Sequence, residues 1–166
     1  MAVYILDTGI WSYWFNPKSN EHSNVNRHIE QLSDNDKLGI SIITWGEIEW
    51  GHRKDSPDGN TTIQSSYIDF IKKQKPTDFF IDIHVTKSYG KLRAGLFKKF
   101  PPKTKNHKWP ELCVDPVSSK ELGIQENDLW IASQAITRNM VLVTNDKMAN
   151  IKMVAGPELR IEYWAK

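Results

Sequence analysis

The chain has one cysteine, Cys113, among its 166 residues. An intrachain disulfide is therefore excluded, as is a zinc site that needs two or four cysteines. Its five histidines are scattered, and none lies in an H-E-x-x-H motif. The sequence also lacks an apolar run of about 18 residues and a basic start followed by an apolar stretch. We therefore expect no membrane span, no signal peptide and a cytoplasmic protein.

The excess of one charge sign is also small, because 22 basic and 20 acidic residues leave a net charge of only +2. It is unevenly spread, however: residues 87–108 contain eight Lys or Arg and no Asp or Glu. Such a block is either a solvated face or a surface for phosphate. The length and the absence of internal repeats predict a single domain, residues 1–166.

Strand-like and helix-like patterns alternate along the chain. The predicted strands are Val3–Leu6, Leu38–Ile43, Phe79–Val85, Val141–Thr144 and Arg160–Trp164. The predicted helices are Thr8–Phe15, Val25–Leu32, Thr44–Arg53, Thr61–Gln74, Thr86–Phe100 and Gln125–Arg138. Strands that alternate with helices of this length predict an α/β fold with a parallel sheet covered by helices on both faces.

Acidic side chains follow three of these strands. Asp7 comes directly after the first strand, Asp146 follows the fourth, and Glu47 lies one helical turn beyond the second. Asp128 opens the helix that leads into the fourth strand, and a helix antiparallel to its strands begins where the strands end. Because ligands of open parallel sheets bind at the carboxyl ends of the strands, the four acids are expected to meet at one edge.

Four carboxylates in one place repel each other. Two unit charges about 4 Å apart repel by roughly 4 kcal/mol at an effective dielectric constant near 20. Either some of the acids protonate or a cation lies among them. Mg²⁺ and Mn²⁺ prefer such oxygen ligands. One or two such ions would activate water for attack on a phosphodiester.

Each acid also has a purely structural explanation. Asp7 fits an N-cap, and Glu47 fits a capping box with Thr44. Asp128 fits a first-turn acid that favours the helix dipole, and Asp146 fits a turn residue. Four independent caps at one edge are a less economical explanation than one site.

These motifs resemble those of the PIN-domain nucleases, and most closely the VapC-type toxins of bacterial toxin–antitoxin modules. The resemblance rests on ILDTGIW, SIITWGEIEWG, ENDLWIASQA and LVTND, in this order. It implies that Asp7, Glu47, Asp128 and Asp146 form a metal-binding catalytic quartet supported by Thr8, Thr144 and Asn145. It also implies a three-layer α/β/α sandwich around a mostly parallel five-stranded sheet, Mg²⁺- or Mn²⁺-dependent RNA cleavage, an antitoxin partner and a homodimer.

The basic block supplies candidate substrate-binding residues. These are Arg93, Lys103, Lys105 and Lys108, with the aromatic residues Phe97, Phe100 and Trp109 interleaved among the lysines. Lysines that follow an RNA backbone and aromatic rings that stack on bases are typical of single-strand binding. A solvated face with ordinary core aromatics explains the same pattern.

Three other functions remain open at this point. Asp7-Thr8-Gly9 also matches the aspartic protease motif, which requires an all-β chain and a second such aspartate. A binding module would use the acids to hold a structural cation or a basic partner segment. A nuclease of RNA processing or decay would keep the chemistry without the toxin role.

Overall fold

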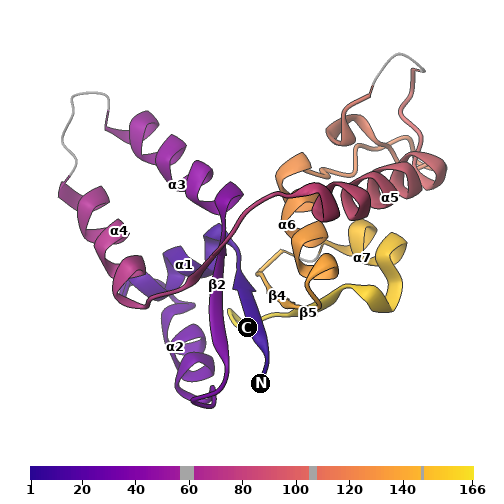
Figure 1. The fold of residues 1–166 in the computed structure, drawn as a ribbon. Helices are drawn as coiled ribbons and strands as arrows, with labels where there is room; N and C mark the ends of the chain where they lie inside the picture. The colour runs from indigo at the N-terminus through magenta and orange to yellow at the C-terminus, as the bar shows by residue number, and fades with distance from the viewer. Residues whose placement is uncertain (57–61, 105–107, 147) are drawn as a thin grey trace. The chain divides into compact units, whose positions relative to one another are not determined.

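A computed structural model describes residues 1–56, 62–104, 108–146 and 148–166 of the chain. Within these ranges strands and helices alternate (Figure 1). The strands are β1 (Val3–Leu6), β2 (Lys37–Ser41), β3 (Thr77–Phe79), β4 (Val141–Val143) and β5 (Arg160–Glu162). The helices are α1 (Thr8–Phe15), α2 (His22–Glu30), α3 (Ile42–Asp55), α4 (Thr62–Lys73), α5 (Ile83–Lys99), α6 (Glu126–Thr137) and α7 (Ala149–Ala155). None of the helices described is long and apolar enough to cross a membrane.

The strands form one sheet in the order β3-β2-β1-β4-β5. The pairs β1–β2, β1–β4 and β2–β3 are parallel. Their residues are largely apolar, and Ile5, Leu6, Ile40 and Leu142 are fully buried. The α/β class and the central, mostly parallel five-stranded sheet that the sequence predicts are therefore confirmed.

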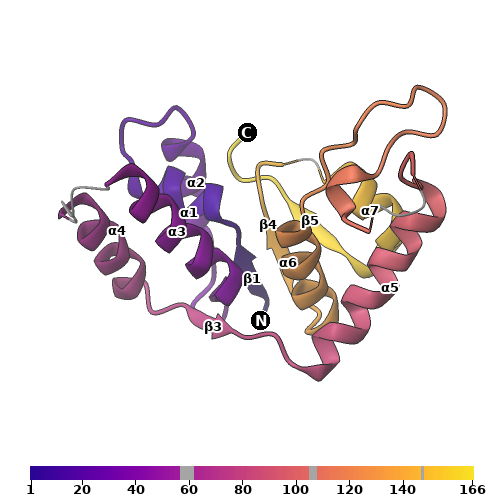
Figure 2. The ribbon, with the colours of Figure 1, turned by 90° about the horizontal axis from the view of Figure 1, so that it is seen from above.

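Internal contacts divide the chain into two compact units. The first unit comprises Met1–Phe80, Met140–Asp146 and Ile161–Lys166. Its helix α1 contacts α2, α3 and α4 (Figure 2). A cluster of buried side chains unites these helices with the sheet, and its bulkiest members are Trp11, Trp14, Tyr67 and Trp164.

The second unit comprises Ile81–Asn139 and Lys147–Arg160. In it, α5 packs against α6 and α7. The α5–α7 contact is close, because a Cβ atom on Gly95 would lie 2.5 Å from Val154 Cγ1. Between α5 and α6 the described residues form a short 3-10 helix, Pro110–Leu112, and two isolated bridges, Pro102 with Cys113 and Val114 with Glu121.

One predicted strand is wrong. Residues Phe79–Val85 do not form a strand: β3 ends at Phe79 and α5 begins at Ile83. The cause is Asp82, whose carboxylate accepts hydrogen bonds from the backbone N–H groups of His84 and Val85 and so caps the helix. The predicted helix Thr8–Phe15 coincides with α1, the other five predicted helices exist with shifted ends, and α7 is an additional helix that the sequence analysis missed.

Candidate active site

The sheet register places the residue after β1 beside the ends of its two neighbours. Leu6 is opposite Ile40 of β2 and Val143 of β4. The backbone N–H of Asp7 extends this ladder by one bond, donating to the carbonyl of Val143 at 3.0 Å. Asp7 therefore begins where the β1 ladder stops, at the carboxyl edge of the sheet.

Asp7 is the N-cap of α1, as its structural explanation predicts. Its Oδ1 accepts a hydrogen bond from the backbone N–H of Ile10 at 2.9 Å. The Thr144 hydroxyl also hydrogen-bonds the carboxylate. The side chain is thereby fixed from two directions, so the cap also holds the acid in one place.

The surroundings of Asp7 disfavour its negative charge. Burial is the largest cause, and the charges of Asp146 and Glu47 add to it; together they outweigh the hydrogen bonds from Thr144 and Ile10 and raise the pKa of Asp7 from 3.8 to about 6. A raised carboxyl pKa inside a cluster of acids is typical of functional sites. A cation would relieve this penalty.

Glu47 reaches the site from α3. Ser41 caps this helix by accepting a hydrogen bond from the backbone N–H of Ile43 at 3.0 Å. The capping box between Thr44 and Glu47 is therefore not formed. Instead, the Glu47 carboxylate accepts a hydrogen bond from the Thr8 hydroxyl, 39 residues away in the sequence. The supporting position predicted for Thr8 thus has a direct contact with an acid of the quartet.

The turn after β4 carries the third acid. Asp146 is exposed, and its backbone N–H donates to the Thr144 hydroxyl oxygen at 3.0 Å. Thr144 is fully buried and also ties this turn to β5, because its N–H donates to the carbonyl of Glu162 at 3.1 Å. The Asn145 amide lies 3.4 Å from the Tyr13 hydroxyl, to which it donates. Thr144 and Asn145 therefore hold the turn next to α1.

The structure brings three of the four predicted acids close enough for their charges to interact, since the charges of Glu47 and Asp146 both raise the pKa of Asp7. Across the described residues, no three His, Cys, Asp or Glu side chains form a ready-made metal cluster. Mg²⁺ keeps several of its water molecules and takes few protein ligands directly. The three carboxylates, with the hydroxyl groups of Thr8 and Thr144 as neighbours, therefore suit a hydrated ion better than one that needs a closed cage.

Asp128 belongs to the second unit. It lies in the first turn of α6 together with Glu126, where acidic side chains complement the helix dipole. Asp128 is therefore the first-turn acid that its structural explanation predicts. Its approach to the other three acids stays a prediction.

Arg93 is engaged in a network inside the second unit. Its guanidinium donates to the Tyr89 hydroxyl at 2.5 Å and to the Lys108 carbonyl at 2.5 Å, and lies 3.3 Å from the Glu126 carboxylate. Glu126 also accepts a hydrogen bond from Tyr89. These contacts tie residue 108, beyond the end of α5, to both α5 and the start of α6.

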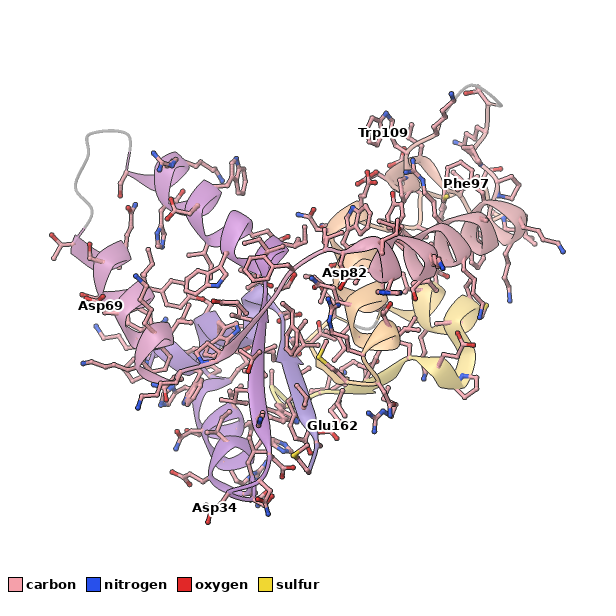
Figure 3. The ribbon with its side chains drawn as sticks, in the orientation of Figure 1. Asp34, Asp69, Asp82, Phe97, Trp109 and Glu162 are labelled. Atoms are coloured by element: carbon pink, nitrogen blue, oxygen red, sulfur yellow. The ribbon has the colours of Figure 1, made fainter. Side chains whose placement is uncertain are left out.

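Of the remaining basic candidates that the structure describes, only Lys108 has a contact with this network, through its carbonyl. Lys103 and Lys108 are exposed, whereas Lys105 is outside the residues that the structure describes. Arg93 and Lys108 line an open hollow of about 480 Å³ with Phe97. Figure 3 labels both Phe97, on α5, and Trp109, in the segment that follows α5 in the chain, and Trp109 is 61% exposed. Cationic and aromatic groups therefore share this part of the second unit.

One residue of the acidic site escaped the sequence analysis. Tyr67 of α4 is buried, yet the negative charge of Asp7 reaches its hydroxyl. In the sequence Tyr67 and Ile71 share one helix face, a spacing typical of core residues. Nothing in that pattern distinguishes a packing tyrosine from one with a polar function.

Comparison with known proteins agrees with this geometry. The PIN domain family matches residues 4–155. Ribonuclease VapC2 of Rickettsia felis is 30% identical over 99% of both chains. The solved VapBC2 complex of Rickettsia felis, bound to a promoter DNA fragment, contains a chain that is 26% identical, with a TM-score of 0.68 and 98% of both chains covered. VapBC-1 of Haemophilus influenzae shares the fold at 23% identity, with a TM-score of 0.68 and 99% of both chains covered. The chain is therefore a member of the PIN-domain family, of the VapC type.

Proposed function

We propose that this chain is an endoribonuclease that cleaves RNA phosphodiester bonds and acts as the toxin of a toxin–antitoxin pair. The observation that carries the proposal is that Asp7, at the carboxyl edge of a parallel sheet, feels the negative charges of both Glu47 and Asp146. The full-length likeness to ribonuclease VapC2 supports the same reaction. Such a nuclease would act in the cytoplasm, where its RNA substrates are.

The activity is proposed to depend on Mg²⁺ or Mn²⁺. The raised pKa of Asp7 and the oxygen donors around it fit such an ion. Asp7, Glu47 and Asp146 would hold it, with Asp128 as the proposed fourth acid. When bound, the ion would supply positive charge that activates water and stabilises the charge of the phosphate.

The chain's own residues perform the positioning. The Ile10 N–H and the Thr144 hydroxyl fix the Asp7 carboxylate, and the Thr8 hydroxyl fixes that of Glu47. Preorganised side chains do not have to be reoriented when substrate arrives, which is the main source of catalytic power in phosphoryl transfer. We propose that residues 1–166 form one nuclease domain, because the match to the PIN domain family runs over residues 4–155 and so includes parts of both units.

RNA is proposed to lie along the basic part of the second unit. Arg93, Lys103, Lys105 and Lys108 are the candidates for its phosphates. Trp109, which is 61% exposed, is available for stacking on a base. Arg93 already contacts Tyr89 and the Lys108 carbonyl, so its contribution to RNA binding would include holding Lys108 in place.

The proposed partner is a cognate antitoxin. The similar solved structures are VapBC toxin–antitoxin complexes, which supports a protein inhibitor for this chain as well. A homodimer is a further prediction from the family resemblance. A short neighbouring gene for a DNA-binding protein would support the toxin role against a role in RNA processing.

The proposal is tested with the purified chain and an end-labelled RNA. Cleavage is expected in Mg²⁺ or Mn²⁺, loss of cleavage in EDTA, and recovery when the ion is added back. Glu47→Gln should lower the rate by about 100-fold or more, because it removes a charged group from the site. The matched control is Asp69→Asn on the exposed face of α4, which should cleave normally. Cleavage that persists in EDTA, or in Glu47→Gln, would contradict the proposed mechanism.

A further inference from the structure

Tyr67 is buried in the first unit, against aromatic rings of two other helices. Only 8% of the residue is exposed. Its ring lies 4.9 Å from the Phe15 ring of α1 and 5.9 Å from the His52 ring of α3, measured between centroids. These are the same two helices that carry Asp7, as the cap of α1, and Glu47. The phenol is thus fixed between the two elements that build the acidic site.

The hydroxyl of this ring is buried without a hydrogen-bond partner among the described residues. Leaving a buried donor unpaired costs free energy, and a phenylalanine would fill almost the same volume without that cost. The large majority of buried side-chain polar atoms in proteins are satisfied. An unpaired hydroxyl at a candidate active site therefore points to a ligand atom that satisfies it.

The hydroxyl is a donor at physiological pH. Burial and then the negative charge of Asp7 raise the pKa of Tyr67 above its ordinary value of 10. It therefore keeps its proton and offers it to an acceptor. The described residues supply no such acceptor within hydrogen-bonding distance, and the acidic site beside it would take up ions and RNA, both of which bring oxygen atoms.

We propose that Tyr67 is a positioning residue of the nuclease, whose hydroxyl donates a hydrogen bond to an oxygen atom that enters the acidic site beside Asp7. This inference rests on the proposed function. The acceptor is either a water molecule that accompanies the divalent ion or a phosphate oxygen of the RNA. Both sources present the same chemistry, an oxygen acceptor close to a carboxylate.

Tyr67→Phe tests the proposal, because it removes the hydroxyl and keeps the ring contacts. Partners that act from outside the metal ligands typically contribute 10–100-fold to metal affinity or activity. We therefore expect RNA cleavage to fall by about 10–100-fold. The melting temperature without metal should stay the same or rise, since a buried unpaired donor is removed. A purely structural role would instead lower the melting temperature.

Two measurements separate the sources of the acceptor. Titration of the metal-free protein with Mn²⁺ alone, by calorimetry, gives the affinity for the ion. Weaker Mn²⁺ binding by Tyr67→Phe would place the acceptor in the water shell of the ion. Unchanged Mn²⁺ binding with a lower kcat/KM for RNA would place it on the phosphate. Unchanged Mn²⁺ binding with unchanged cleavage would overturn the inference.

The matched control is Tyr4→Phe, the same chemical change at a partly buried tyrosine that packs on Trp164. It should leave Mn²⁺ affinity and cleavage unchanged. A wild-type chain that neither binds Mn²⁺ nor cleaves RNA would refute the proposed function itself. If the wild type binds Mn²⁺ and cleaves RNA, and Tyr67→Phe does so equally well, only the role of Tyr67 is refuted.

Discussion

Replacing Asp7 with Asn is expected to destroy cleavage and, at neutral pH, to stabilise the protein. Both effects have the same physical origin. The site holds a carboxylate whose charge is disfavoured by burial and by two neighbouring acids. The asparagine has nearly the same shape but no charge. Asn is also as good an N-cap as Asp, so α1 keeps its first-turn hydrogen bond.

The magnitude follows from the pKa of Asp7, which is raised from 3.8 to about 6 in the folded protein. Well below pH 3.8, Asp7 is protonated in both the folded and the unfolded protein, and its burial costs no folding stability through charge. As the pH rises to about 6, the unfolded chain loses its proton first, and folding stability falls. Above that range the full penalty is roughly 3 kcal/mol, at 1.36 kcal/mol for each pKa unit. At pH 4.5 it is only about 1 kcal/mol.

The variant removes this penalty but exchanges one hydrogen bond of the carboxylate for one of a carboxamide. We assign about 1 kcal/mol to that exchange. The net gain is then about 2 kcal/mol at pH 7.5, which corresponds to a rise of roughly 4–8 °C in melting temperature for a chain of this size. At pH 4.5 the gain should vanish.

The assay is thermal unfolding followed by circular dichroism, in EDTA, at both pH values. Asp69→Asn serves as the control for loss of an exposed charge. An Asp7→Asn variant that is no more stable than wild type at pH 7.5 would refute the reasoning about burial and repulsion. In Mn²⁺ the wild type should have the higher melting temperature, because the ion stabilises only the protein that binds it. RNA cleavage by the variant should fall by about 100-fold or more.

Two further predictions concern the sheet and the basic block. Gly39→Ala should lower stability by about 1–3 kcal/mol in chemical denaturation, because its Cβ would lie 2.3 Å from the Phe79 ring; Gly46→Ala, with open space around it, is the control and should not destabilise. A variant with both Lys103 and Lys108 changed to Ala should lower the salt slope of log affinity for single-stranded RNA by about 1.4 if each lysine contacts one phosphate. An unchanged salt slope would show that these lysines do not contact RNA phosphates.

The sheet and the first three acids were predictable because local signals agree with the fold. Buried strands are apolar on both faces, so Val3–Leu6 and Val141–Val143 are recognised by composition. The acids follow such strands directly or by one turn, and parallel pairing then brings their ends together. The site thus follows from topology, which the alternation of strands and helices reveals.

The errors occur where a single side chain decides between conformations. Phe79–Val85 is apolar enough for a strand, but Asp82 captures the N–H groups of the next turn and starts a helix there. The Thr8–Glu47 bond joins residues on different helices, which periodicity cannot reveal. Tyr67 has the spacing of a core residue, and only its unpaired hydroxyl, seen in three dimensions, distinguishes it.

The segment between α5 and α6 also supports the helix that bears Asp128. The Glu111 carboxylate accepts a hydrogen bond from the backbone N–H of Glu126 at 2.9 Å, and Arg93 holds the Lys108 carbonyl while it contacts the Glu126 side chain. These contacts join residues 108–112 to the first turn of α6. Deleting those residues for crystallisation or engineering would therefore loosen that turn, two residues from Asp128.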